Sequence, residues 1–379
     1  MKAALFFEDN QLCHLGENIG KKAIKVSTIT TEDDKVVSIK NSEVKNRNMN
    51  YFIQWLVDCG IKMIYVSGID EKIKRFFFWL GYFFPNLTRY KKFMNFFDTQ
   101  YRMTNCQYDE ALLSKALFDF DTIVCESDVI WSPHSTQGFD NGFFCNLPSM
   151  RGKNKISYAA CIGYTNFSEK RQARFRELLK NFDSISVREI QGTEFTQEYT
   201  DKPVVNVLDP TLLLDAEDYA KIAVKPKEKH YLLVYNCLKN NRKMLEDAHK
   251  IAKERGLEVI EISVFYTNIF RNKVKLSIGI EEFLGYFMHA DFILTNAFHG
   301  VCFSLINKKS FYTYARGTKD SRVTSILHLL HLDDRFLQND QEMPAVTEID
   351  YDDVYKHLQA EREKSAKFLT DAFAKSLEA

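Results

Sequence analysis

The chain has 379 residues, which is long for one hydrophobic core and suits two domains of ordinary size. Lysine plus arginine and aspartate plus glutamate both number 51, so no overall charge recruits nucleic acid, and no nucleic-acid partner is expected. The eight cysteines are scattered without a C-x-x-C motif, which argues against a disulfide framework or a zinc site. We expect a cytoplasmic protein, because no apolar run approaches the ~20 residues of a spanning helix and the amino terminus lacks a secretory signal.

Short apolar runs alternate with longer amphipathic segments along the chain. The runs expected to form strands are residues 62–67, 122–125, 155–160, 184–187, 231–235, 258–262 and 292–295. The segments expected to form helices are residues 169–181, 239–255, 281–290 and 301–307. Alternation of this kind predicts an α/β fold with parallel sheets built from βαβ units.

The pattern divides the chain into two Rossmann-like lobes and a final helix. We expect an N-terminal lobe over residues 1–205 and a C-terminal lobe over residues 206–350, because a proline-rich and charged stretch lies at 200–225. Residues 351–379 are charged and amphipathic and predict a long helix. That helix either packs back on the first lobe or lies free on the surface.

The segment 74–102 crowds aromatic residues among lysines and arginines. One interpretation is a helical hairpin that caps the first sheet and buries its rings, since aromatic side chains are mostly core residues. The other is a surface at the headgroup boundary of a membrane, which basic residues with Trp and Phe suit. The two interpretations are compatible on different faces of one helix.

Five motifs follow one another between about residue 100 and residue 335. They are Ser127–Trp131 with 142–144, Lys155–Gly163, Phe182–Glu189, Val207–Leu214 and Thr295–Gly300. In this order they resemble the polysaccharide pyruvyl transferase family. The resemblance implies a two-lobed fold like that of the GT-B glycosyltransferases, with the active site in the cleft that the lobes face.

The resemblance also implies an activity and its partners. Members of this family move the pyruvyl group of phosphoenolpyruvate onto two hydroxyls of a sugar, forming a ketal and releasing phosphate, in surface polysaccharide synthesis. Phosphoenolpyruvate is then a co-substrate on the second lobe, and the sugar acceptor binds the first. A polyprenyl-diphosphate-linked oligosaccharide as acceptor would place the protein on the inner membrane face, with segment 74–102 as its membrane contact.

Two other functions stay open. A GT-B-like glycosyltransferase that uses a nucleotide sugar would need an acidic residue for the ribose hydroxyls, and Glu281 and Glu282 are candidates. A non-catalytic glycan-binding relative is favoured by departures from the family pattern. One departure is Ala297, which stands where some members carry an arginine before the histidine.

The donor pocket needs cations and free backbone N–H groups, because phosphoenolpyruvate carries a phosphate and a carboxylate. Arg188 follows an expected strand and is a candidate for catalysis and donor binding; a surface ion pair is the alternative. His299 matches the family's histidine and is a candidate for proton transfer or phosphate binding, with a purely structural histidine as the alternative. Gly300 would let the backbone approach the phosphate.

Further basic residues follow the last expected strand, where the resemblance implies donor contacts. Arg316 and Lys319 lie in an expected loop that could reach the donor. Arg322 ranks below them, because it could instead form an ion pair along its own helix.

The acceptor side is expected at the end of the strand 122–125. Asp128 could orient sugar hydroxyls and Trp131 could stack on a sugar face; the alternatives are a helix cap and a core residue. His134, in the polar loop that follows, is a weaker candidate.

One acidic cluster is a candidate cation site. Asp350, Asp352 and Asp353 have a spacing that many sugar-nucleotide transferases use for a divalent cation. They open an expected helix, where acids are ordinary caps, so no metal is expected there. No cofactor is implied besides phosphoenolpyruvate as co-substrate.

Overall fold

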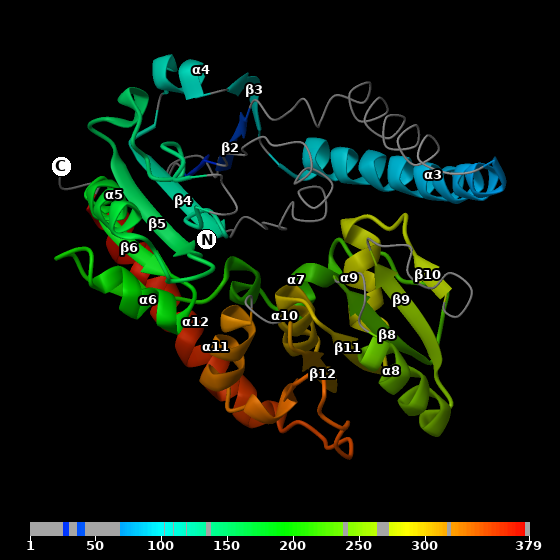
Figure 1. The fold of residues 1–379 in the computed structure, drawn as a ribbon. Coiled ribbons are helices and arrows are strands. Elements are labelled where there is room, and N and C mark those ends of the chain that lie inside the picture. Colours follow the sequence, from blue (N-terminus) through cyan, green and yellow to red (C-terminus); the bar gives the residue numbers. More distant parts are fainter. Residues whose placement is uncertain are drawn as a thin grey trace.

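The chain folds into two β-sheets with helices around them (Figure 1). The computed structural model describes residues 26–29, 36–41, 69–101, 103–108, 110–118, 120–133, 138–237, 242–263, 273–316 and 320–375. The expected strand at 62–67 and two candidate site residues, His134 and Lys319, lie outside the described residues.

The first sheet has seven strands in the order β3-β2-β1-β4-β5-β6-β7. Strands β4 to β7 run parallel, whereas β1 is antiparallel to both of its neighbours. The strands are β1 Val26–Ile29, β2 Val36–Asn41, β3 Met103–Tyr108, β4 Thr122–Asp128, β5 Asn154–Ala160, β6 Ser184–Val187 and β7 Val204–Asn206. The helices of this lobe are α4 Glu110–Lys115, α5 Glu169–Leu179 and α6 Ile190–Gln197.

The second sheet has six strands, all parallel, in the order β10-β9-β8-β11-β12-β13. Its strands are β8 Tyr231–Asn236, β9 Glu258–Ser263, β10 Lys273–Lys275, β11 Phe292–Thr295, β12 Phe311–Tyr314 and β13 Phe336–Leu337. Every residue of β8 and β11 is buried, as expected for strands covered on both faces. The helices are α8 Arg242–Arg255, α9 Ile280–His289, α10 Phe298–Ile306 and α11 Ser321–Leu329.

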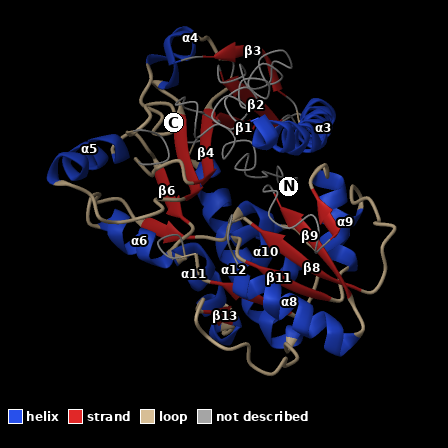
Figure 2. Cartoon of the chain, turned by 45° about the vertical axis from the view of Figure 1, so that its right-hand side comes forward, coloured by secondary structure: helices blue, strands red, loops and turns tan. Residues whose placement is uncertain are grey.

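This is the two-lobed, Rossmann-like α/β fold that the sequence predicts. The first sheet ends with β7 at Asn206 and the second begins with β8 at Tyr231. The connection between the sheets contains the short helices η3 Pro210–Leu213 and α7 Ala216–Ala220. Figure 2 shows the two sheets as separate groups of strands, and Figure 1 shows α7 between them.

The basic-aromatic segment forms one continuous helix, α3 Ile69–Gln100, so the predicted hairpin was wrong. The rings of Phe93, Phe96 and Phe97 are buried in the core of the second lobe, not over the first sheet. Lys92 forms an ion pair with Glu282 of α9, which also holds α3 against the second lobe. Although α3 has 32 residues, neither it nor any other helix in the described ranges is long and apolar enough to cross a membrane.

The final helix, α12 Tyr351–Ala374, contacts both lobes. Near its start, Val354 and Leu358 are buried in the core of the second lobe. Near its end, Ala372 packs against β4 and β5 of the first sheet, and its carbonyl accepts a hydrogen bond from Asn154 Nδ2 at 2.9 Å. In Figure 1 this helix, coloured red, runs from the second lobe toward the first.

Candidate functional site

A buried ion pair stands where the two lobes meet. Arg188 directly follows β6, and its Nη1 donates to Asp209 Oδ2 at 2.5 Å, with both side chains only 2% exposed. Ser127, near the end of β4, joins the pair: its Oγ donates to Asp209 Oδ2 at 2.8 Å and accepts from Arg188 Nη1 at 3.0 Å. The alternative of a surface ion pair for Arg188 is therefore wrong.

Asp209 is the centre of this hydrogen-bond network. Its other oxygen, Oδ1, accepts from the Thr211 backbone N at 3.1 Å and from Thr211 Oγ1 at 2.6 Å, which also caps η3. Burial alone would raise the pKa of Asp209, but the charges of Arg188 and His299 and the hydrogen bonds from Thr211 and Arg188 lower it. Asp209 is thus a buried, charged carboxylate.

His299 approaches the pair from the second lobe. It is the second residue of α10, just beyond the carboxyl end of β11, and its Nε2 lies 3.9 Å from Asp209 Oδ1. This distance is too long for a hydrogen bond but close enough for a charge interaction when the imidazole is protonated. Its side chain is 12% exposed, so it is more accessible than the two residues of the pair.

Two arginines flank one aromatic ring beside His299. The guanidinium carbon of Arg188 lies 5.1 Å from the centre of the Phe298 ring, and that of Arg322 lies 5.7 Å from it. Arg322, in the first turn of α11, is 8% exposed. The sequence ranked Arg322 lowest of the three basic candidates, yet the structure places it beside Phe298 and the cluster.

Arg316 follows β12 and is half-buried. Its backbone N donates to Asp320 Oδ1 at 2.7 Å, which ties the start of its loop to α11. Its side-chain Nε is buried and has no hydrogen-bond partner among the described residues. No described contact joins Arg316 to Arg188, Asp209 or His299, so its role in donor binding stays a proposal.

A second buried carboxylate adjoins the ion pair. Glu189 is 2% exposed, and neither of its carboxylate oxygens has a hydrogen-bond partner within the described ranges. It lies close to the Cys161 thiol, whose pKa rises to about 12 because of burial and then the negative charge of Glu189, while Arg188 and Arg322 oppose the rise. The site thus gathers two arginines, two carboxylates and one histidine.

Three members of this cluster were missed in the sequence: Asp209, Ser127 and Glu189. Asp209 lies in a quoted motif, and its position before a proline and two residues before a threonine is the usual signal of a side chain that caps a turn. That signal predicts local structure but not an ion pair with a residue of another strand. Ser127 and Arg188 reach Asp209 because β4, β5, β6 and β7 lie side by side in one parallel sheet, and this order cannot be read from the local sequence.

Gly300 has a packing role that the sequence did not reveal. It is buried in the first turn of α10, and a Cβ atom added to it would lie 2.1 Å from Thr295 Oγ1. Thr295 is held in place, because its Oγ1 donates to the Tyr235 carbonyl at 3.0 Å and accepts from Ala297 N at 3.0 Å. Because Gly300 has no side chain, α10 packs closely on β11. The proposed approach of the Gly300 backbone to a phosphate stays a prediction.

We expect Gly300→Ala to destabilise the protein by about 1–3 kcal/mol, because the new methyl group overpacks against Thr295. Chemical denaturation of the variant and of the wild type measures this difference in unfolding free energy. Thr295→Ala removes the nearest atom, so the double variant should be destabilised by less than the sum of the two single variants. Strict additivity would show that the two residues do not press on one another.

The prediction that Trp131 stacks on a sugar was wrong, and the core alternative is correct. The indole is fully buried, and its Nε1 donates to the Phe143 carbonyl at 3.2 Å. The rings of Phe144, Phe175 and Phe182 surround it with centroids 5.2, 5.8 and 5.4 Å away. A residue so enclosed cannot reach a ligand without unfolding the core of the first lobe.

Asp128 lies at the end of β4, next to Ser127 of the cluster. It is half-exposed and has a φ of +93°, a backbone conformation that side chains rarely adopt. Its Oδ1 accepts from Val129 N at 2.6 Å, and no described helix begins at this point, so it is not a helix cap. A strained carboxylate beside the site fits the acceptor role proposed for it.

The fold and the cluster define a class. This is a two-lobed α/β protein with a charged site at the carboxyl ends of β4, β6 and β11, the edge at which such sheets bind ligands. The family model for polysaccharide pyruvyl transferase matches residues 44–318. That match covers more than half of the chain, so the chain belongs to the polysaccharide pyruvyl transferase family, as the resemblance implied.

Solved structures give weaker similarities. The UDP-GlcNAc 2-epimerase of Methanocaldococcus jannaschii is 14% identical over 69% of this chain and 78% of its own, with a TM-score of 0.40. The wall teichoic acid polymerase TagF is 12% identical over 58% of this chain and 68% of its own, with a TM-score of 0.30. A comparison with curated proteins finds no match.

Proposed function

We propose that the protein transfers the pyruvyl group of phosphoenolpyruvate to two hydroxyls of a sugar in a glycan, forming a pyruvate ketal and releasing phosphate. Membership in the polysaccharide pyruvyl transferase family supports pyruvyl transfer in polysaccharide synthesis. The observation that carries the residue assignment is the position of His299, 3.9 Å from the buried carboxylate of Asp209 where the two lobes meet.

Asp209 suits His299 to proton transfer. A buried carboxylate stabilises the imidazolium form, so the ring can hold a proton and pass it to a reacting group. Arg188 Nη1 donates a hydrogen bond to Asp209, and its positive charge favours the ionised form of that carboxylate. Asp209 acts through His299 and is a positioning residue, whereas His299 is the proposed catalytic residue.

The arginines of the site fit the donor. Phosphoenolpyruvate carries a phosphate and a carboxylate, and arginine is the side chain best suited to both. The guanidinium groups of Arg188 and Arg322 lie over the Phe298 ring next to His299. Arg316 follows β12, which pairs with β11 in the second sheet. We assign the donor to this side, with Lys319, outside the described residues, as a further candidate.

The reaction balances without a cofactor. A proton adds to the methylene carbon of phosphoenolpyruvate and makes it a methyl group, while positive charge develops at the neighbouring carbon. One sugar hydroxyl attacks that carbon, and the bond between the carbon and the phosphate oxygen breaks. A second sugar hydroxyl then attacks the same carbon and closes the ketal. The two hydroxyl protons replace the one consumed at the methyl carbon and protonate the departing phosphate. The guanidinium groups of the site would stabilise the negative charge on the phosphate.

The acceptor side is assigned to the first lobe. Asp128, half-exposed beside Ser127, is the candidate for orienting sugar hydroxyls. We propose a lipid-linked glycan as acceptor, with α3 touching the membrane surface through residues that do not pack on the second lobe. Phe84 is 57% exposed and Lys91 is exposed, which supports such a contact.

We expect Lys91→Glu to reduce binding to vesicles of anionic lipid, measured by co-sedimentation. Lys91 is the suitable site, because the neighbouring Lys92 pairs with Glu282 and a change there would disturb the packing of α3. Lys221→Glu, which alters the exposed lysine directly after α7 in the connection between the sheets, is the matched control and should leave vesicle binding unchanged. Equal binding by wild type and Lys91→Glu would leave α3 with a packing role alone.

Donor choice separates this function from the glycosyltransferase alternative. Glu282, one of the two acidic candidates for ribose binding, is engaged in capping α9 at Gly279 N and in the ion pair with Lys92. We expect phosphoenolpyruvate to raise the melting temperature of the protein more than equal concentrations of inorganic phosphate or of UDP- and CDP-sugars. Protection by a nucleotide sugar, and none by phosphoenolpyruvate, would favour the glycosyltransferase.

A further inference from the structure

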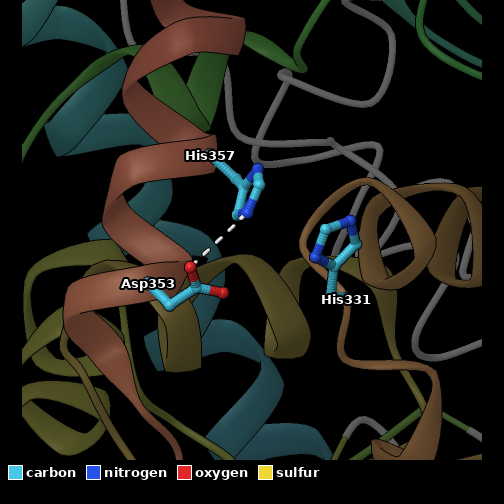
Figure 3. Close-up of side chains that lie close together, drawn as sticks. All are labelled: His331, Asp353 and His357. Atoms are coloured by element: carbon cyan, nitrogen blue, oxygen red, sulfur yellow. Dashed lines mark ion pairs between the residues drawn. The ribbon is translucent and has the colours of Figure 1, made fainter.

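Three metal-ligating side chains converge at the far end of α11 from Arg322. They are His331, Asp353 and His357, and their ligand atoms all lie within 4.8 Å of one another. Figure 3 shows Asp353 and His357 on neighbouring turns of α12 and His331 on the segment opposite them. None of the three belongs to the site described above.

The spacing on α12 favours a shared ligand. Asp353 and His357 are four residues apart, which places them on one face of the helix, and His357 Nε2 lies 3.6 Å from Asp353 Oδ1. The ring centroids of His331 and His357 are 4.4 Å apart. In a tetrahedral zinc site the ligand atoms stand roughly 3.3 Å apart, so small side-chain rotations would bring all three to one ion.

The backbone at His331 is unusual for a histidine. His331 N donates to the His328 carbonyl and Leu332 N to the Leu327 carbonyl, the two hydrogen bonds of a Schellman motif that ends α11. The residue in this left-handed position is usually glycine, yet His331 adopts it with a φ of +57°. The motif directs the chain so that the imidazole faces α12 (Figure 3).

We propose that His331, Asp353 and His357 bind one divalent transition-metal ion of the zinc class. Two imidazoles and one carboxylate suit zinc, copper or nickel and not magnesium or calcium, which prefer oxygen ligands alone. Asp353 and His357 are partly exposed, so water completes the coordination and the ion enters from solvent. The ion would join the end of α11, whose first turn carries Arg322, to α12, which contacts both lobes.

This site differs from the acidic cluster of Asp350, Asp352 and Asp353, which is the candidate cation site in the sequence. Asp350 Oδ1 accepts from Asp352 N at 3.1 Å and from Asp353 N at 3.3 Å, so Asp350 is the helix cap that was expected. Only Asp353 of that group turns its carboxylate toward the histidines. His331 lies outside the acidic motif and His357 lies beyond it on α12, and no local sequence pattern joins them to it.

Calorimetric titration of the untagged, full-length protein with Zn²⁺ tests the proposal. We expect one ion per chain, and at least about 100-fold weaker binding in His331→Asn and in His357→Asn. Asparagine tolerates the left-handed backbone, so His331→Asn should keep the turn. The matched control is His328→Asn: His328 is exposed on α11, its Nδ1 lies 3.4 Å from Asp333 Oδ1, and its loss should leave zinc binding unchanged.

A second readout concerns geometry. Co²⁺ in place of Zn²⁺ should give an absorption spectrum of a low-coordinate site in wild type and in His328→Asn, but not in the other two variants. Circular dichroism of each variant confirms that the fold is kept. Absence of Zn²⁺ binding by the wild type would overturn the proposal, as would binding that survives in both His331→Asn and His357→Asn.

Discussion

His299→Ala is expected to lower the rate of acceptor-dependent phosphate release from phosphoenolpyruvate by about 10²–10⁴-fold, the usual contribution of a positioned proton-transfer group. The physical reason is the loss of the imidazole that Asp209 holds in charge contact at 3.9 Å. Phosphate release is measured with a panel of sugar acceptors. The melting temperature should change little, because Arg188 and Thr211 still donate hydrogen bonds to the Asp209 carboxylate when the imidazole is removed.

The control for this variant is His289→Ala. His289 ends α9, and its ring Nδ1 lies 3.0 Å from the carbonyl of Gly285 in its own helix, so activity should stay at the wild-type level. Added imidazole should partly restore activity to His299→Ala if proton transfer was lost. Retention of most activity by His299→Ala would remove His299 from the mechanism, whatever the control shows.

Asp209→Asn is expected to destabilise the protein by about 3–5 kcal/mol, because it leaves the buried Arg188 without a negative partner. Denaturant unfolding measures the loss. The matched control is Asp218→Asn, which breaks an exposed pair with Lys221 and should cost less than about 0.5 kcal/mol. Similar losses in the two variants would contradict the importance of the buried pair.

The same pair gives a pH dependence. The pKa of Asp209 is lowered in the folded protein, so its contribution to stability is present above the ordinary aspartate pKa of about 3.9 and is lost as the pH falls through the lower folded value. Asp209→Asn should therefore flatten part of the decline in stability below about pH 4. An apolar double replacement, Arg188→Met with Asp209→Leu, should recover stability lost in either single variant but not activity.

The elements with continuous apolar runs could be predicted from the sequence. Strand β6 was expected at 184–187 and lies there, and β11 was expected at 292–295 and lies there, because buried parallel strands need apolar side chains on both faces. Strand β12, at 311–314, was missed, although its phenylalanine, tyrosines and threonine favour a strand. The apolar runs located β8, β9 and β11, which are three of the six strands of the second sheet.

Tertiary partners could not be predicted. The aromatic residues of α3 indicated burial, but nothing in the segment shows that Phe93 and Phe96 face the second lobe. Arg188 was found because a strand end is a likely place for a ligand-binding cation in this fold class, whereas Asp209 was not, because its partner comes from another strand. Gly300 was explained by the wrong cause, as only the structure shows Thr295 beneath it.

The central claim is pyruvyl transfer from phosphoenolpyruvate, and its most direct test follows both products together. The protein is incubated with phosphoenolpyruvate and galactose-, glucose- and mannose-type acceptors, including lipid-linked ones; phosphate is quantified and the acceptor is analysed for a pyruvate ketal by NMR. We predict one phosphate released for each ketal formed with at least one acceptor. Absence of both products, together with no thermal protection by phosphoenolpyruvate, would contradict the account.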